Sequence, residues 1–172
     1  MQQTKNNIPL KARIQVVSYL NTRLADCLDL GTQAKQAHWN VKGPSFHALH
    51  LLFDEVAEDI EAYSDLIAER LVQLGGTARG TAREVAASSS LAEYPHEITK
   101  GDEHLNVLAD ALAAFGALVR EGITDCSTFS MHSRVSRRAP YLYRRAKPAS
   151  EAGAGRPTLK SLVSPSHLTA TR

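Results

Sequence analysis

The amino-acid sequence predicts an all-α protein in which three long helices make up most of a bundle. Apolar residues recur at spacings of three and four over most of the first 125 residues, and no stretch there shows the alternation typical of a strand. The composition agrees, because 43% hydrophobic and 22% charged residues in a chain of 172 are typical of one soluble globular domain.

The first long helix is predicted over residues 8–40. Asn7 stands where an N-cap would, and Pro9 is tolerated in a first turn. The apolar positions of this helix are Ile14, Val17, Leu20, Leu24, Cys27 and Leu28. Cys27 is interpreted as a core residue on this face. Gly43 and Pro44 then interrupt the pattern and predict a turn.

The second long helix is predicted over residues 45–74, before the pair Gly75 and Gly76. Its apolar positions are Phe46, Leu49, Leu52, Phe53, Val56, Ile60, Tyr63, Ile67, Leu71 and Leu74. Because only a short turn joins it to the first helix, the two are expected to form an antiparallel hairpin.

A short helix is predicted over residues 81–87, and the third long helix over residues 99–121. The apolar face of the long one comprises Leu105, Leu108, Leu112, Phe115, Leu118 and Val119. His47 and His104 have no partners at ligand spacing, so the sequence assigns them no role.

The composition changes at residue 126, which suggests three regions: an N-terminal tail (1–7), a helical domain (8–125) and a C-terminal segment (126–172). Residues 1–125 hold 11 basic and 17 acidic residues, whereas residues 126–172 hold 9 basic residues and one acidic. This segment, rich in Ser, Arg and Pro, is typical of disorder, with one short helix predicted over 127–138. A change of reading frame and a genuine basic tail are both open explanations.

The sequence predicts a cytoplasmic protein that does not enter a membrane. Apolar runs are only a few residues long and the first ten residues are polar, so neither a membrane span nor a secretory signal is expected. The two cysteines, Cys27 and Cys126, are too few for a disulfide framework, which favours a reducing compartment.

The second long helix carries a stripe of metal-ligand residues. His50 and Asp54 are four residues apart, as are Asp65 and Glu69, and the eleven-residue step between the pairs ends only about 20° past three turns. Imidazole with carboxylate is a ligand set for iron, manganese or zinc. The alternative is that each residue belongs to an ordinary solvated helix face.

The rise per residue of a helix determines which of these side chains can bind the same metal ion. Asp54 and Asp65 are eleven residues apart, hence about 16 Å along one helix, whereas metal–ligand bonds are about 2 Å long. They can meet at one ion if this helix packs antiparallel on its copy in a second subunit, with His38 joining His50 and Asp54. Dimerisation is therefore expected to be a condition of metal binding.

These residues carry a resemblance to a known family. The segment from Lys35 to Phe46, followed by His50, Asp54, Asp65 and the run Ala68-Glu69-Arg70 before two glycines, resembles the Dps family, the ferritin-like DNA-binding proteins from starved cells. The similarity covers roughly residues 8–121. The spacing of His38, His50, Asp54, Asp65 and Glu69 is specific to that family.

The resemblance implies a dodecameric shell of ferritin-like four-helix bundles with ferroxidase centres at twofold interfaces. His38, His50 and Asp54 match ligands from one subunit, Asp65 and Glu69 those from its neighbour, and Trp39 an aromatic residue beside the centre. The implied reaction is oxidation of Fe(II) to Fe(III), preferably by hydrogen peroxide, with iron stored as ferric mineral. The family's fourth long helix is atypical or missing in this sequence.

DNA binding is a second activity that the resemblance implies, with association with the nucleoid. The C-terminal segment contains a candidate phosphate-binding patch, in which basic residues are interleaved with Tyr141 and Tyr143. The basic residues are Arg134, Arg137, Arg138, Arg144, Arg145 and Lys147. Two alternative functions remain at this point. One is a nonspecific DNA-binding protein without iron turnover, and the other a C-terminally defective family member that forms no shell.

Overall fold

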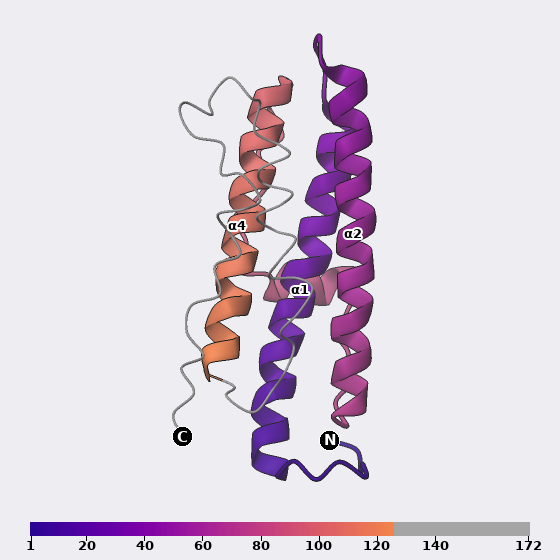
Figure 1. Cartoon of the computed structure of the whole chain (residues 1–172), viewed down its shortest axis with the longest axis vertical. Coiled ribbons are helices and arrows are strands. Elements are labelled where there is room, and N and C mark those ends of the chain that lie inside the picture. Colours follow the sequence, from indigo (N-terminus) through magenta and orange to yellow (C-terminus); the bar gives the residue numbers. More distant parts are fainter. Residues whose placement is uncertain (126–172) are drawn as a thin grey trace, which may run out of the picture.

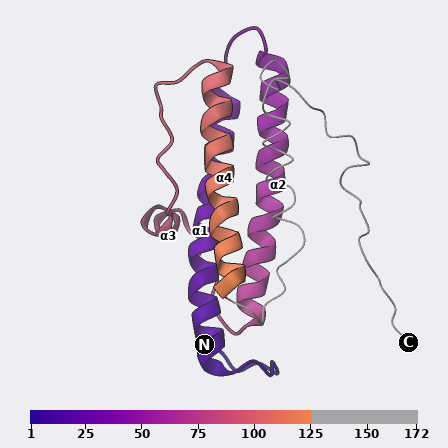
Figure 2. The same ribbon diagram turned by 60° about the vertical axis from the view of Figure 1, so that its left-hand side comes forward.

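The computed structural model describes residues 1–125 of the chain. This part contains three long helices and one short helix, joined by connecting segments. The helices are α1 (Leu10–Asn40), α2 (Phe46–Gln73), α3 (Ala82–Ser88) and α4 (Gly101–Asp125). The long helices run side by side, with α1 between α2 and α4 in the view of Figure 1, and α3 lies across their direction (Figures 1 and 2). The helix α1 packs against each of the other three.

All four helices predicted for this region are confirmed, and no helix end differs from its predicted position by more than four residues. The helix predicted over 127–138 lies outside the described residues. Among those that are described, no helix combines the length and the apolar character that a membrane span requires.

The prediction that Asn7 caps the first helix is wrong. The N-cap position of α1 is Pro9, whose backbone is extended, and no side chain caps the helix there. Instead, Asn6 Oδ1 accepts a hydrogen bond of 2.8 Å from the Ile8 N–H, which forms an Asx turn before the helix. The proline thus displaces the helix start beyond the reach of Asn7.

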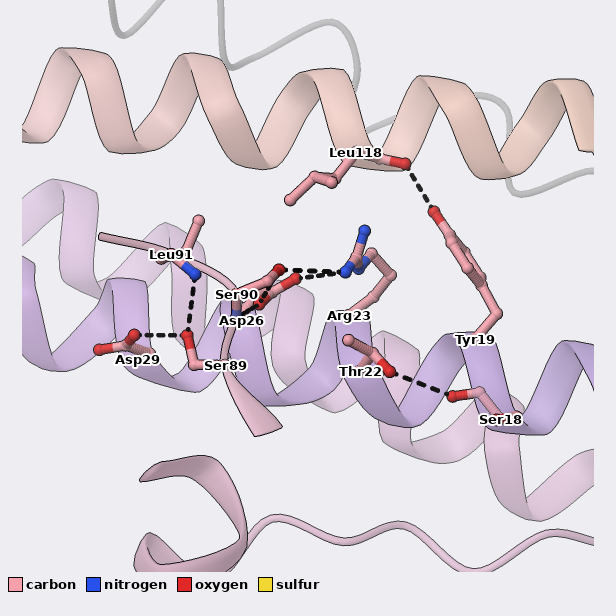
Figure 3. Close-up of polar contacts among 10 residues, drawn as sticks. All are labelled: Ser18, Tyr19, Thr22, Arg23, Asp26, Asp29, Ser89, Ser90, Leu91 and Leu118. Carbon is pink, nitrogen blue, oxygen red and sulfur yellow. Dashed lines mark hydrogen bonds and ion pairs between the residues drawn. The ribbon is translucent and has the colours of Figure 1, made fainter. Parts of the chain in front are cut away.

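The core lies where the apolar faces of α1, α2 and α4 meet. Its largest fully buried side chains include Leu20, Leu30, Phe53, Ile60 and Ile67. Against this core, Gly122 of α4 faces Tyr19 of α1, and a Cβ there would overlap the tyrosine ring. The Tyr19 hydroxyl donates a 2.7 Å hydrogen bond to the Leu118 carbonyl, tying the two helices together (Figure 3).

The helix α2 ends in a Schellman motif. Gly75 adopts a positive φ of 82°, and the N–H of Gly76 donates a 2.9 Å hydrogen bond to the Leu71 carbonyl. Arg13 reaches across from α1 and donates to the Leu74 carbonyl at 3.1 Å. The C-terminal end of α2 is therefore held in place by both a local turn and a neighbouring helix.

A buried ion pair anchors the long connection between α2 and α4. Arg23 Nη2 lies 2.8 Å from Asp26 Oδ2, and the Asp26 side chain is fully buried. Asp26 Oδ1 accepts hydrogen bonds from the backbone N–H and the hydroxyl of Ser90, at 2.7 and 2.9 Å (Figure 3). The long segment that connects α2 to α4 is thus fixed to α1 at Ser90, near the middle of that segment.

Cys27 is buried in the core, as its place on the apolar face predicts. Burial, with a smaller contribution from the nearby Asp26 carboxylate, raises the pKa of the Cys27 thiol from 9.0 to about 12. At about pH 8 this leaves roughly a thousandfold less thiolate than an exposed cysteine would have. Since thiolate is the nucleophile, the folded protein should protect this residue.

We therefore expect iodoacetamide to leave Cys27 unmodified in the native chain at about pH 8 and to alkylate it fully in urea. The measurement is mass spectrometry of the peptide that contains Cys27. Because the raised pKa disfavours the thiolate in the folded state, protection should weaken only as the pH approaches 12. Equal alkylation in native and unfolded protein would contradict the burial.

Candidate metal centre

His38 and His50 hold each other in place through their backbones. His38 Nδ1 lies 2.8 Å from the His50 carbonyl, and His50 Nδ1 lies 2.9 Å from the His38 carbonyl. The rings stack with centroids 3.7 Å apart. Because a carbonyl oxygen only accepts, each Nδ1 must carry the proton, which leaves each neutral ring a lone pair at Nε2. This tautomer and fixed orientation are those of a metal-binding histidine.

Asp54 is the carboxylate next to these imidazoles. Its Oδ1 lies 3.9 Å from His38 Nδ1 and accepts a hydrogen bond from the Lys35 ammonium. That hydrogen bond, together with the charge of the Lys35 ammonium and against an opposing effect of burial, holds the pKa of the Asp54 carboxyl below its ordinary value. Asp54 is therefore held as an anion, with the Lys35 ammonium as its cationic partner.

We expect Lys35→Met to strengthen Fe(II) binding by about threefold, because exposed ion pairs are weak and the ammonium competes for the same oxygen. Titration calorimetry without oxygen measures the change, with the exposed Lys11 substituted as Lys11→Met for the control. Weaker binding in Lys35→Met would instead mean that the lysine holds Asp54 in its binding position.

Asp65 and Glu69 lie on the same helix, away from the histidines. The helix α2 is continuous from Phe46 to Gln73, so the helix rise places Asp65 about 16 Å from Asp54. Both Asp65 and Glu69 are exposed, and Glu69 borders an open depression with Ala68, Val72, Gln73 and Ala78. Within the described part of one chain, no three His, Cys, Asp or Glu side chains form a metal-binding group.

The predicted ligands therefore fall into two sets within one chain. The structure places His38, His50 and Asp54 near one another at one end of the α1–α2 pair, although these three do not form a metal-binding group within one chain, and it leaves Asp65 and Glu69 toward the other end. Lys35 was missed by the sequence analysis, although its spacing of three residues before His38 places it on the same face of α1.

Comparisons with known proteins identify the family. A protein-family model for the ferritin-like domain matches residues 17–132. The DNA protection during starvation protein of Agrobacterium fabrum is 42% identical over 122 residues, covering 71% of this chain and 75% of that protein. This chain belongs to the Dps family. The related protein of Halobacterium salinarum is 33% identical over 105 residues, covering 61% of this chain and 56% of that protein.

Solved structures of Dps proteins have the same fold. The tetragonal form of Mycobacterium smegmatis Dps superposes with a TM-score of 0.75 at 25% identity, covering 84% of this chain and 90% of that chain. DpsC from Streptomyces coelicolor gives 0.78 at 23% identity, covering 98% and 95%. The expected ferritin-like, all-helical fold of this Dps-family chain is thereby confirmed.

Two further predictions for this Dps-family chain concern Trp39 and the C-terminal basic residues. Trp39 follows His38 at the end of α1 and is 70% exposed, so it does not serve as core packing within one subunit. The basic residues predicted to bind DNA, from Arg134 to Lys147, lie outside the described residues.

Proposed function

We propose that this chain is an iron-storage and DNA-protection protein that oxidises Fe(II) to Fe(III), preferably with hydrogen peroxide. Membership of the Dps family and the ferritin-like domain support the general function. The observation that carries the finer proposal is the pair of imidazoles whose Nδ1 atoms are bound to carbonyls, beside an ionised carboxylate. This arrangement leaves two Nε2 lone pairs and an anionic oxygen for iron.

The complete site is proposed to form between two subunits. His38, His50 and Asp54 of one chain would bind one iron, while Asp65 and Glu69 from the second chain would complete the site. The separation of about 16 Å along α2 supports this division, since no single ion reaches both sets. The exposed apolar side chains Leu51, Leu66 and Val72 of the same helix would be covered in such a pairing.

The proposed chemistry transfers two electrons to one peroxide. Two Fe(II) ions and two protons reduce hydrogen peroxide to two waters, which gives two Fe(III) and no hydroxyl radical. Carboxylates favour the harder ferric product, whereas the imidazoles suit the ferrous substrate. Trp39 would lie beside this site as an exposed aromatic side chain at the end of α1.

Two measurements test this proposal. Light scattering should give about 224 kDa for twelve copies of the 18.7 kDa chain, against about 37 kDa for a dimer. Stopped-flow absorbance should then detect Fe(III) formation that consumes one peroxide per two Fe(II), with no hydroxyl radical captured by a spin trap. A dimer would contradict mineral storage, and peroxide consumption with one radical per iron would contradict paired oxidation.

DNA protection is proposed to depend on the C-terminal basic residues and not on iron. Chain termination after residue 125 should abolish retardation of duplex DNA, while Asp65→Asn should leave it unchanged. Binding through phosphates should also weaken steeply with salt. Retardation that survives the truncation would place the DNA contact elsewhere. The proposed location is the cytoplasm, with the nucleoid where DNA is bound.

A further inference from the structure

Tyr94 and His104 form a buried pair that attaches the connection between α3 and α4 to the bundle. Tyr94 lies in this connection and is 6% exposed, while His104 lies on α4 and is 1% exposed. The Tyr94 hydroxyl is 2.5 Å from His104 Nδ1, and the two rings stack with centroids 6.1 Å apart. The proposed iron chemistry uses neither residue.

The connection is fixed at both ends, and Tyr94 is its anchor between them. At one end Ser90 is hydrogen-bonded to Asp26 of α1, and at the other the Thr99 carbonyl accepts a 3.1 Å hydrogen bond from the backbone that follows α1. Among residues 91–98, Tyr94 alone is buried, and the others are exposed or half-buried. Release of this one side chain would therefore loosen the stretch without detaching its ends.

The hydrogen bond between the pair runs from the phenol to the imidazole. Burial raises the pKa of Tyr94 to about 12, so its hydroxyl keeps the proton. With His104 Nδ1 as the acceptor, the ring proton is assigned to Nε2, which is buried without a hydrogen-bond partner in the described region. The bond to Tyr94 therefore requires a neutral imidazole.

The surroundings of His104 offer little compensation for a positive charge. The helix α2 contributes the Phe53 ring, edge-on at 6.3 Å, the end of α1 contributes a backbone group, and the connection contributes the Tyr94 phenol. The charge that acts on the ring is that of Glu103, the preceding residue of α4. The titratable side chains of the connection itself are exposed, and they are Glu93, His96 and Glu97.

Protonation of His104 is unfavourable while the pair stays buried. Burial lowers the pKa of His104 below its ordinary value of 6.5, and the opposing effects of Glu103 and the backbone are smaller. The imidazole therefore binds a proton more readily once it is exposed to water. Its contribution to the buried state is full above pH 6.5 and declines as the pH falls below that value.

We propose that Tyr94 and His104 form an acid-sensitive latch, in which uptake of one proton by His104 frees Tyr94 and residues 91–98 from the bundle. The proton comes from solvent and occupies Nδ1, so the phenol loses its acceptor and forms its hydrogen bond with water instead. Because opening takes up one proton, its equilibrium constant should rise about tenfold for each pH unit below about 6.5. The three long helices stay packed.

Ultraviolet difference absorbance of the full-length, iron-free chain tests the latch, because a tyrosine that moves from a core into water absorbs at shorter wavelength. Between about pH 7.5 and 5, the range in which histidine titrates, the unsubstituted chain should show one reversible tyrosine step. Circular dichroism should retain its helix signal, and light scattering its mass. Tyr94→Phe should abolish the step. Tyr19→Phe is the matched control and should keep it, since the Tyr19 hydroxyl donates to the Leu118 carbonyl, which does not titrate.

Two histidine variants separate the latch from other effects of acid. His104→Asn should remove the step, because an amide oxygen can accept the hydrogen bond of Tyr94 but takes up no proton in this range. His96→Gln is the matched control, since His96 is exposed in the same connection and its variant should keep the step. A role of His104 in packing alone would not make the step depend on a titrating side chain.

Absence of the step from the unsubstituted chain, or an equal step in Tyr94→Phe or His104→Asn, would overturn the proposal. A loss of mass that accompanies the step would assign it to disassembly and also contradict the latch. If His104→Asn does not fold, the unsubstituted chain decides, because the open-to-closed ratio must change with the uptake of one proton and any other number refutes the latch. Since no iron is present, these outcomes are independent of the proposed ferroxidase activity.

Discussion

Iron oxidation should return when two inactive variants of this chain are unfolded and refolded together. The first, Asp54→Asn, damages the set of ligands near the histidines, and the second, Glu69→Gln, damages the set farther along α2. Each alone is expected to lose about a hundredfold in rate, as losses at metal sites commonly reach this size. In a random mixture, about a quarter of the sites combine two undamaged sets, so about a quarter of the activity should return.

The result depends on the proposed exchange of ligands across a twofold axis. Stopped-flow measurement of Fe(III) formation with peroxide gives the rate, and light scattering verifies that the mixture has the mass of the parent assembly. The control mixes Asp54→Asn with His50→Ala, which damage the same set and should not complement each other. Failure of the first mixture, with correct assembly, would mean that Asp65 and Glu69 do not act with a neighbouring chain.

Asp26→Asn is expected to destabilise the protein by about 3–5 kcal/mol, because it leaves the Arg23 guanidinium buried without its counter-ion. The same substitution weakens the hydrogen bonds that hold Ser90 and the connection between α2 and α4 (Figure 3). Urea unfolding followed by circular dichroism measures the loss. The matched control is Asp110→Asn, at an exposed position of α4.

A double variant separates the cost of the unpaired buried charge from the other effects of the substitution on the free energy of unfolding. Replacing both partners, as Arg23→Met with Asp26→Leu, removes the unpaired charge and should restore most of the stability. It should still fall short of the parent by about 1–3 kcal/mol, because the Ser90 N–H loses its acceptor. A loss in Asp26→Asn no larger than in Asp110→Asn would show that the ion pair is not needed for folding.

The elements of the fold were readable in the sequence because they depend on local periodicity and turns. The spacing of Phe53, Val56, Ile60 and Ile67 defines a helix face that becomes the core, and Gly75 ends the helix as its positive φ requires. The separation of the two predicted ligand sets also follows from local geometry, since a straight helix fixes the distance from Asp54 to Asp65.

The contacts that orient the site could not be read from the sequence. His38 and His50 exchange hydrogen bonds with each other's carbonyls only because α1 and α2 pack with their ends in register. Lys35 pairs with Asp54 across the same interface. Nothing in the spacing of either helix specifies which carbonyl an imidazole will reach.

The hydrogen bond between Tyr94 and His104 is a further contact that the sequence did not predict. By itself the sequence determined four helices, their apolar faces and the spacing along the chain of the predicted metal-ligand residues, because these depend on a helical period of about 3.6 residues. Only the tertiary structure decided that a tyrosine from a connecting segment meets a histidine of α4, and that Arg23 and Asp26 are buried with Ser90. Such pairings are set by the packing of segments distant in the chain, where burial makes each polar group find a partner.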